Sequence, residues 1–181
     1  DTQMLYGAQV ISDIWKETNG DAIVVSDVGQ HQMLEAQYYK HDEPNTLLTS
    51  GGLGTMGFSL PAAIGASFYN RNKDIWVIVG DGSIQMTITE LATAVQENAN
   101  IKIAIINNGY LGMVRQWQQL FYDSRYSETP ISSPDYVKLS EAYGLKGIRV
   151  ISRPEIPSAI YEAQKINGPV LVEFVVEQHD M

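Results

Sequence analysis

The sequence has no cysteine, few basic residues and no long apolar run. Without cysteine the chain cannot form disulfides, iron–sulfur clusters or thiolate zinc sites. Its 12 lysines and arginines are outnumbered by 21 aspartates and glutamates, which gives a net charge of −9 without any basic cluster. Binding to nucleic acid or to an anionic membrane surface is therefore not expected.

The signals of export and membrane insertion are also missing. No apolar run approaches the roughly 20 residues that a transmembrane helix needs, and the N-terminus has neither the basic region nor the apolar stretch of a signal peptide. We therefore expect a soluble, cytoplasmic protein. A length of 181 residues suits one domain. Because the chain begins without methionine and ends abruptly, we expect residues 1–181 to be a fragment of a longer multidomain subunit.

Short apolar runs rich in β-branched residues alternate along the chain with segments of helical periodicity. Strands covered on both faces are expected to be continuously apolar, and four runs fit this description, at residues 22–25, 75–79, 101–106 and 170–176. Weaker candidates lie at residues 46–49 and 147–151. The pattern predicts an α/β fold with a doubly wound, mostly parallel sheet, helices on both faces, and a ligand site at the carboxyl ends of the strands.

Several helices are predicted between these runs. Apolar residues recur at helical spacing near residues 10–15 and 91–95. Ser133 is predicted to cap a later helix with Pro134 at its first position, and a last helix is predicted to begin at Arg153-Pro154-Glu155.

Polar residues follow two of the strongest strand candidates. Asp81 lies between two glycines directly after one strand, and Asn108 follows the next strand along the chain. A carboxylate and an amide oxygen suit Mg²⁺, which completes its coordination with water and substrate phosphates. Each motif alone is more typical of a turn or a helix start. Together they predict a Mg²⁺-diphosphate site, because sequential strands are usually neighbours in a sheet.

These motifs resemble those of the thiamine diphosphate enzymes, in which Gly-Asp-Gly is followed at this spacing by Asn-Asn. The closer resemblance is to acetolactate (acetohydroxyacid) synthases, and it covers nearly the whole chain. It is carried by Val28-Gly29-Gln30-His31-Gln32-Met33, by residues 50–57, by Gly80-Asp81-Gly82-Ser83 and by residues 107–118, of which Gly-Met-Val-x-Gln-Trp-Gln is the most particular. The chain thus resembles the C-terminal, pyrophosphate-binding domain of the catalytic subunit.

The resemblance implies a set of roles. Mg²⁺ would be bound by Asp81, Asn108 and the main-chain carbonyl of Tyr110. The diphosphate would contact Gln30, His31, Gly82 and Ser83. Gly54 would accept a hydrogen bond from the amino group of the pyrimidine, and Met56 would hold the cofactor bent. The remaining residues implied to contact the cofactor are Val28, Gly29, Met113 and Val114, and those implied to contact substrate are Met113, Val114 and Trp117.

The reaction implied is carboligation of pyruvate with pyruvate or 2-ketobutyrate, giving 2-acetolactate or 2-aceto-2-hydroxybutyrate in branched-chain amino-acid biosynthesis. No residue of this chain can be assigned the glutamate that activates the cofactor in such enzymes, so that residue is expected in another domain and the fragment alone is expected to be inactive. A homodimer or homotetramer is implied, and FAD bound by other domains and a regulatory subunit are compatible with the family.

Three other interpretations remain open at this point. Gly52-x-Gly54-x-x-Gly57 is also a dinucleotide-binding fingerprint, with Asp81 as a candidate ribose ligand of a nicotinamide cofactor. The chain could also be a non-catalytic cofactor-binding scaffold. Finally, Met113, Val114 and Trp117 recur at a helical spacing that is more typical of a packed core than of a pocket.

Overall fold

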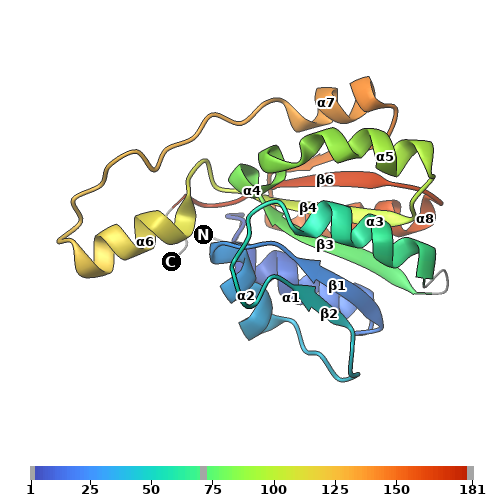
Figure 1. Cartoon of the computed structure of the whole chain (residues 1–181), viewed down its shortest axis with the longest axis horizontal. Coiled ribbons are helices and arrows are strands. Elements are labelled where there is room, and N and C mark those ends of the chain that lie inside the picture. Colours follow the sequence, from blue (N-terminus) through green and yellow to red (C-terminus); the bar gives the residue numbers. More distant parts are fainter. Residues whose placement is uncertain (1–2, 70–72, 179–181) are drawn as a thin grey trace.

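The structure, a computed structural model, describes residues 3–69 and 73–178. They form one six-stranded sheet in which every pairing is parallel and the strand order is β2-β1-β3-β4-β6-β5 (Figure 1). The strands are β1 (Ala22–Ser26), β2 (Leu47–Thr49), β3 (Asp74–Gly80), β4 (Ile101–Asn107), β5 (Lys146–Val150) and β6 (Val170–Val175). All six predicted strands are confirmed.

Eight α-helices lie before or between the strands in this part of the chain. They are α1 (Gly7–Glu17), α2 (Gln30–Tyr38), α3 (Ser59–Tyr69), α4 (Asp81–Met86), α5 (Leu91–Gln96), α6 (Gly112–Phe121), α7 (Tyr136–Tyr143) and α8 (Ile156–Lys165). Short 3₁₀ turns precede α5 and α8, at Ile88–Glu90 and Arg153–Glu155. No helix among the described residues is both long and apolar enough to cross a bilayer.

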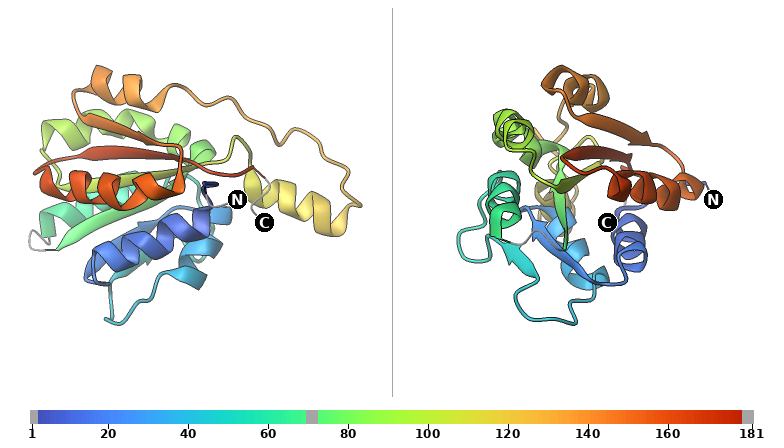
Figure 2. Two further views of the ribbon diagram at one scale, coloured as in Figure 1. Left: turned by 180° about the vertical axis from the view of Figure 1, so that it is seen from behind. Right: turned by 90° about the vertical axis from the view of Figure 1, so that its right-hand side faces the viewer.

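Helices cover both faces of the sheet, as Figure 2 shows in its edge-on view. On one face α1 and α8 pack on side chains such as Val24, Trp76 and Val172. On the other, α3, α5 and α7 pack on side chains such as Val25, Val77 and Ile103. Successive residues of one strand thus face opposite cores, which explains why the strands are continuously apolar. The predicted doubly wound architecture is confirmed.

One local prediction differs from the structure. Helix α7 begins at Tyr136 with Asp135 as its cap, through a bond from the Lys138 amide to the Asp135 carboxylate. The predicted cap Ser133 lies before the helix, and its hydroxyl instead donates to the Asp81 carboxylate at 3.2 Å. The later prediction is confirmed: Arg153-Pro154-Glu155 opens the α8 segment, with a capping box formed by Ser152 and Glu155.

The packed-core interpretation of the apolar residues on helix α6 does not fit the structure. The helix projects from one end of the sheet (Figure 1), and Val114 and Trp117 are 46% and 56% exposed. Leu120 and Phe121 on the same helix are exposed as well.

One lysine is fully buried at the start of the central strand β4. The ammonium of Lys102 donates to the carbonyls of Ile166 and Gly168, at 2.5 and 2.9 Å, and to the side chain of Asn100. Burial lowers the pKa of Lys102 to about 8. Lys102 therefore connects β4 to the turn that precedes β6, at the end of the sheet opposite the strand carboxyl ends.

Replacing Lys102 by methionine, which keeps an unbranched side chain but removes the ammonium group, is expected to destabilise this part of the sheet by about 2 kcal/mol, because the carbonyls of Ile166 and Gly168 lose their donor. Faster amide hydrogen exchange in β4 and β6 would measure the change. The matched control is Lys138→Met, since Lys138 is largely exposed on α7; its exchange should match the parent. Equal protection of these amides from hydrogen exchange in Lys102→Met and the parent would show that the hydrogen bonds of Lys102 contribute nothing to stability.

Candidate functional site

A cavity of about 820 Å³, part of it open to solvent, lies where the carboxyl ends of β1, β3 and β4 meet. Strands β2 and β3 lie on opposite sides of β1, so the strand order reverses at this place. Ligands of open α/β sheets bind at such a reversal, so the cavity lies where the fold predicts a ligand site.

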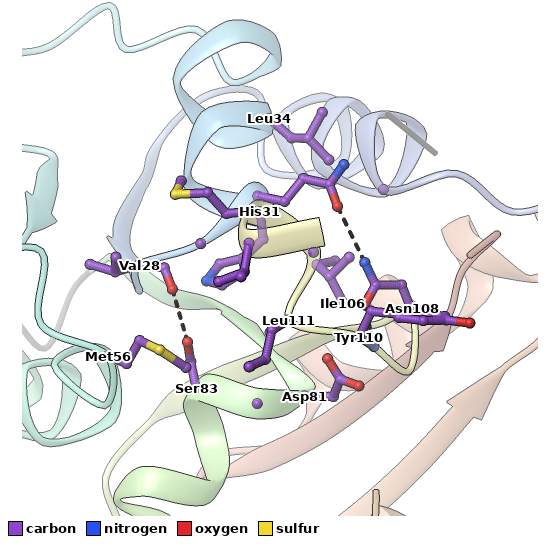
Figure 3. A pocket seen from close by; sticks show the side chains of 18 of the residues that line it. Val28, His31, Leu34, Met56, Asp81, Ser83, Ile106, Asn108, Tyr110 and Leu111 are labelled. Atoms are coloured by element: carbon purple, nitrogen blue, oxygen red, sulfur yellow. Dashed lines mark hydrogen bonds between the residues drawn. The ribbon is translucent and has the colours of Figure 1, made fainter. Parts of the chain in front are cut away.

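The cavity brings together nearly all the residues that the sequence singled out. The predicted residues that line it are Val28, Gly29, Gln30, His31, Gly54, Met56, Asp81, Gly82, Ser83, Asn108, Tyr110, Met113 and Val114. Figure 3 shows that the side chains of Asp81, Ser83, Met56 and His31 gather around it from separate segments. Trp117 does not line the cavity.

Asp81 is the buried acid of the site. It begins α4 directly after β3, and its Oδ2 accepts hydrogen bonds from the Gly109 amide at 3.0 Å and the Ser133 hydroxyl at 3.2 Å. Its main-chain carbonyl accepts a bond from the hydroxyl of buried Tyr136. Burial raises the pKa of Asp81 to about 6, although the hydrogen bonds from Ser133 and Gly109 oppose the shift. A cation beside this carboxylate would favour its charged form.

Asn108 lies beside Asp81 because β3 and β4 are neighbours. Its amide nitrogen donates to Gln30 Oε1 at 3.2 Å, which is one of the bonds drawn in Figure 3. Its Oδ1 accepts a bond from the Tyr110 amide at 3.0 Å. The turn is fixed further by bonds from Ile131 to the Gly109 carbonyl and from Leu111 to the Thr129 carbonyl, neither of which uses the Tyr110 carbonyl.

His31 is buried in the wall of the cavity. A Cβ atom at Gly29 or Gly80 would lie within 2.7 or 2.8 Å of its imidazole ring, so both positions need glycine for the ring to fit. Burial lowers the pKa of His31 to about 4, against the opposing influence of the Asp27 carboxylate, and the ring is therefore uncharged at neutral pH. Its Nε2 atom is buried and has no hydrogen-bond partner among the residues that the structure describes.

The glycine-rich segment at residues 50–58 is held in place by a carboxylate that the sequence analysis did not assign a role. Asp27 is fully buried at the end of β1. Its two oxygens accept bonds from the amides of Val28, Gly57 and Ser59, at 2.8–2.9 Å. Asp27 therefore fixes the loop that carries Gly54 and Met56.

This arrangement does not fit the dinucleotide-binding interpretation. In that motif the strand before the glycine loop pairs with the following strand, which carries the ribose ligand. Here the glycine loop follows the edge strand β2, and Asp81 follows β3, with β1 between them.

Comparison with known proteins agrees with the geometry. Residues 27–174 match the family described as thiamine pyrophosphate enzyme, C-terminal TPP binding domain. The chain belongs to this family. The match includes every segment that lines the TPP-binding-domain cavity except its borders at Gly7, Val176 and Glu177.

The chain is also similar to curated proteins named acetolactate synthase. It is 51% identical over 173 residues to the large subunit of Corynebacterium glutamicum, 48% identical over 168 residues to the mitochondrial catalytic subunit of Saccharomyces cerevisiae, and 49% identical over 155 residues to the isozyme 3 large subunit of Escherichia coli. These matches cover 92%, 93% and 85% of this chain but only 28%, 24% and 27% of the relatives. The chain therefore spans about a quarter of their length.

The residues of this TPP-binding domain fit the cofactor of the family. Helices α2 and α6 begin at Gln30 and Gly112, both in the cavity wall, and helix N-termini favour anions such as a diphosphate. The unpartnered Nε2 of His31 adds a polar atom at the same wall. A carboxylate, an amide and a main-chain carbonyl form an all-oxygen donor set of the kind that Mg²⁺ binds.

Some lining residues were not predicted. Leu34, Ile106, Leu111 and Val176 add apolar surface to the cavity. Leu111 and Gly112 lie within the matched motif, so their sequence position could have indicated them. Leu34 and Val176 carry no such signal, because they reach the cavity only through the packing of α2 and the end of β6.

Proposed function

We propose that this chain is the part of an acetolactate synthase that binds thiamine diphosphate and Mg²⁺. The reaction of the complete enzyme would be the carboligation of pyruvate with pyruvate or 2-ketobutyrate. The observation that carries the proposal is the meeting of Asp81 and Asn108 at neighbouring strand ends, in a cavity whose other walls come from the remaining matched motifs. The names of the most similar relatives support the same reaction.

Each side chain would have a distinct task. Asp81, Asn108 and the Tyr110 carbonyl would hold Mg²⁺, and Gln30, His31, Gly82 and Ser83 would contact the diphosphate. In the structure the Ser83 hydroxyl donates to the Val28 carbonyl at 2.9 Å, which fixes its direction in the wall.

At the other end of the cavity, Gly54 would accept a bond from the pyrimidine amino group and Met56 would support the bend of the cofactor. Val28, Gly29, Met113 and Val114 would add contact surface. When bound, thiamine diphosphate supplies the electron sink for decarboxylating a 2-ketoacid. The contribution of this chain would be to orient the cofactor and to exclude water from it.

Other parts of the reaction would come from outside this chain. An activating glutamate is expected in another domain, and the isolated chain is expected to be inactive. The complete enzyme would act as a homodimer or homotetramer. Because relatives are named large or catalytic subunits, a regulatory subunit is a further expected partner. Any FAD in the complete enzyme would be bound by other domains.

The proposal is tested with the full-length polypeptide that contains this chain. Calorimetric titration should show that thiamine diphosphate binds only when Mg²⁺ is present, and incubation with pyruvate should yield 2-acetolactate. Binding of a nicotinamide dinucleotide without binding of thiamine diphosphate would contradict it. Tight binding of the cofactor without product would instead favour a scaffold.

Replacing Trp117 by leucine is expected to change the choice of the second ketoacid while leaving cofactor affinity within about a factor of two. Trp117 is half exposed on α6 and lies one helical turn beyond Met113 and Val114, which line the cavity, so its loss changes the approach to the cavity rather than its walls. The readout is the ratio of 2-aceto-2-hydroxybutyrate to 2-acetolactate from mixed ketoacids. The control is Leu120→Ala on the same helix. An unchanged ratio in Trp117→Leu would remove this residue from the substrate path.

A further inference from the structure

A second carboxylate, Glu173, lies buried beside the end of β4. It belongs to β6, and its side chain is 4% exposed. One oxygen accepts a bond from the Asn107 amide nitrogen at 2.7 Å, and the other accepts a bond from Arg149 Nε at 2.7 Å. Both oxygens of Glu173 are thus already engaged by protein donors.

The bond to Glu173 determines which way the Asn107 amide faces. A carboxylate only accepts hydrogen bonds, so the NH₂ group of Asn107 points to Glu173 and its Oδ1 points to the other side. There Oδ1 accepts the Gly109 amide at 3.2 Å, and the same amide donates to Asp81 Oδ2 at 3.0 Å. The Gly109 N–H is therefore shared between Asn107 and the buried acid of the site.

We propose that Glu173 is a positioning residue that sets the metal loop, residues 107–110, by fixing the orientation of the Asn107 amide. The inference rests on the proposed function, because it concerns how Asn108 and the Tyr110 carbonyl are presented to Mg²⁺. Glu173 acts through Asn107 and is not itself a ligand.

The contacts of Arg149, which donates to the second oxygen of Glu173, support this role. Arg149 also donates to the carboxylate of Asp135 at 2.7 Å, and Asp135 caps α7. Two residues next to this cap contact Asp81. The Ser133 hydroxyl donates to the Asp81 carboxylate, and the Tyr136 hydroxyl donates to the Asp81 main-chain carbonyl. Hydrogen bonds therefore lead from Asp81 through Glu173 to Asp135, and the peptide chain next to Asp135 leads back to Asp81 through Ser133 and Tyr136.

The decisive variant is Glu173→Gln. If the glutamine oxygen accepts from Arg149, its NH₂ group faces the NH₂ group of Asn107, so Asn107 must turn over and present a donor to the Gly109 N–H. In the full-length polypeptide with excess thiamine diphosphate, we expect the Mg²⁺ dissociation constant to rise about 10- to 100-fold, as for other residues that orient metal ligands. Calorimetric titration with Mg²⁺ measures it without reference to turnover.

The compensating variant is Glu173→Gln combined with Asn107→Asp. The aspartate can accept from the glutamine NH₂ group with one oxygen and from the Gly109 amide with the other, and the net charge of the pair is unchanged. We expect Mg²⁺ affinity to return to within about threefold of the parent, whereas Asn107→Asp alone places two carboxylates together and should not improve on Glu173→Gln. Such non-additivity identifies a direct coupling between the two side chains.

A matched control distinguishes a specific loss of Mg²⁺ affinity from a general loss of stability. Asp13 is another buried carboxylate bonded to an arginine, Arg153, and it lies on α1 away from the metal loop. Asp13→Asn should lower the melting temperature but leave the Mg²⁺ dissociation constant unchanged. If Glu173→Gln does not fold, Asn107→Ala, which keeps the Glu173–Arg149 pair, should show the same loss of Mg²⁺ affinity.

The outcomes separate this inference from the proposed function. Parent protein that binds no Mg²⁺ with thiamine diphosphate overturns the proposed function. Normal Mg²⁺ binding by the parent together with an unchanged dissociation constant in Glu173→Gln or Asn107→Ala overturns the role of Glu173 alone. Failure of the double variant to recover affinity also overturns it.

Discussion

Replacing Asp81 by asparagine is expected to weaken the Mg²⁺-dependent binding of thiamine diphosphate by at least about 100-fold, the upper end of what loss of an outer-shell partner costs a metal site. Asp81 is the single acid among the proposed ligands, and among the described residues no group of three His, Cys, Asp or Glu side chains could form another metal site. The measurement is titration of the cofactor at fixed Mg²⁺ in the full-length polypeptide.

The same substitution should not destabilise the protein without cofactor. Burial raises the pKa of Asp81 to about 6, so at neutral pH the folded state bears the cost of a buried charge that asparagine lacks. The melting temperature of the cofactor-free variant should equal or exceed that of the parent. Ser133→Ala, which removes only one donor to this carboxylate, serves as control and should weaken binding by a few-fold. Unchanged cofactor affinity in Asp81→Asn would contradict the metal assignment.

The largest expected effect on stability comes from Asp27→Ala. Three main-chain amides, of Val28, Gly57 and Ser59, lose their acceptor. Each unsatisfied buried group costs about 1–3 kcal/mol, so the local loss should reach at least about 3 kcal/mol. Amide hydrogen exchange at Gly57 and Ser59 would then accelerate by about 100-fold or more, since about 1.4 kcal/mol corresponds to a factor of ten.

Two further variants sharpen this experiment. Asp27→Asn keeps one acceptor oxygen and should show roughly half of the loss of local stability expected for Asp27→Ala. Asp21→Asn changes an exposed acid at the opposite end of β1 and should leave exchange at Gly57 and Ser59 as in the parent. Slow exchange of both amides in Asp27→Ala would show that the loop at residues 50–58 is held by other contacts.

The sheet could be predicted from sequence because its strands are short and apolar on both faces, a pattern that helices on both sides require. Asp81 and Asn108 could be paired for a related reason: they follow consecutive strands, and consecutive strands are usually adjacent. The family motifs then supplied most of the remaining cavity wall, including Gln30, His31 and Met56.

The residues that organise the site could not be found in this way. The bonds from Asp27 to Gly57, from Ser133 to Asp81 and from Asn107 to Glu173 join positions 30, 52 and 66 residues apart. Glu173 is one charged residue inside an apolar strand, and no local pattern indicates its partner. For helix α6 the spacing left core and pocket both open, because helical periodicity reveals an apolar stripe without revealing what lies against it. In the structure this helix projects beyond the sheet.

The polar residues at the two ends of β4 have a consequence for how the sheet assembles. Between Lys102 and Asn107 the strand consists of isoleucine and alanine alone, so a slip of two positions against β6 would keep every side chain on its proper face. Such a slip would separate the Lys102 ammonium from the carbonyls of Ile166 and Gly168. It would also separate the Asn107 amide from the Glu173 carboxylate. The polar residues at the two ends of β4 thus select one register of β4 against β6 among several that the apolar side chains alone would allow.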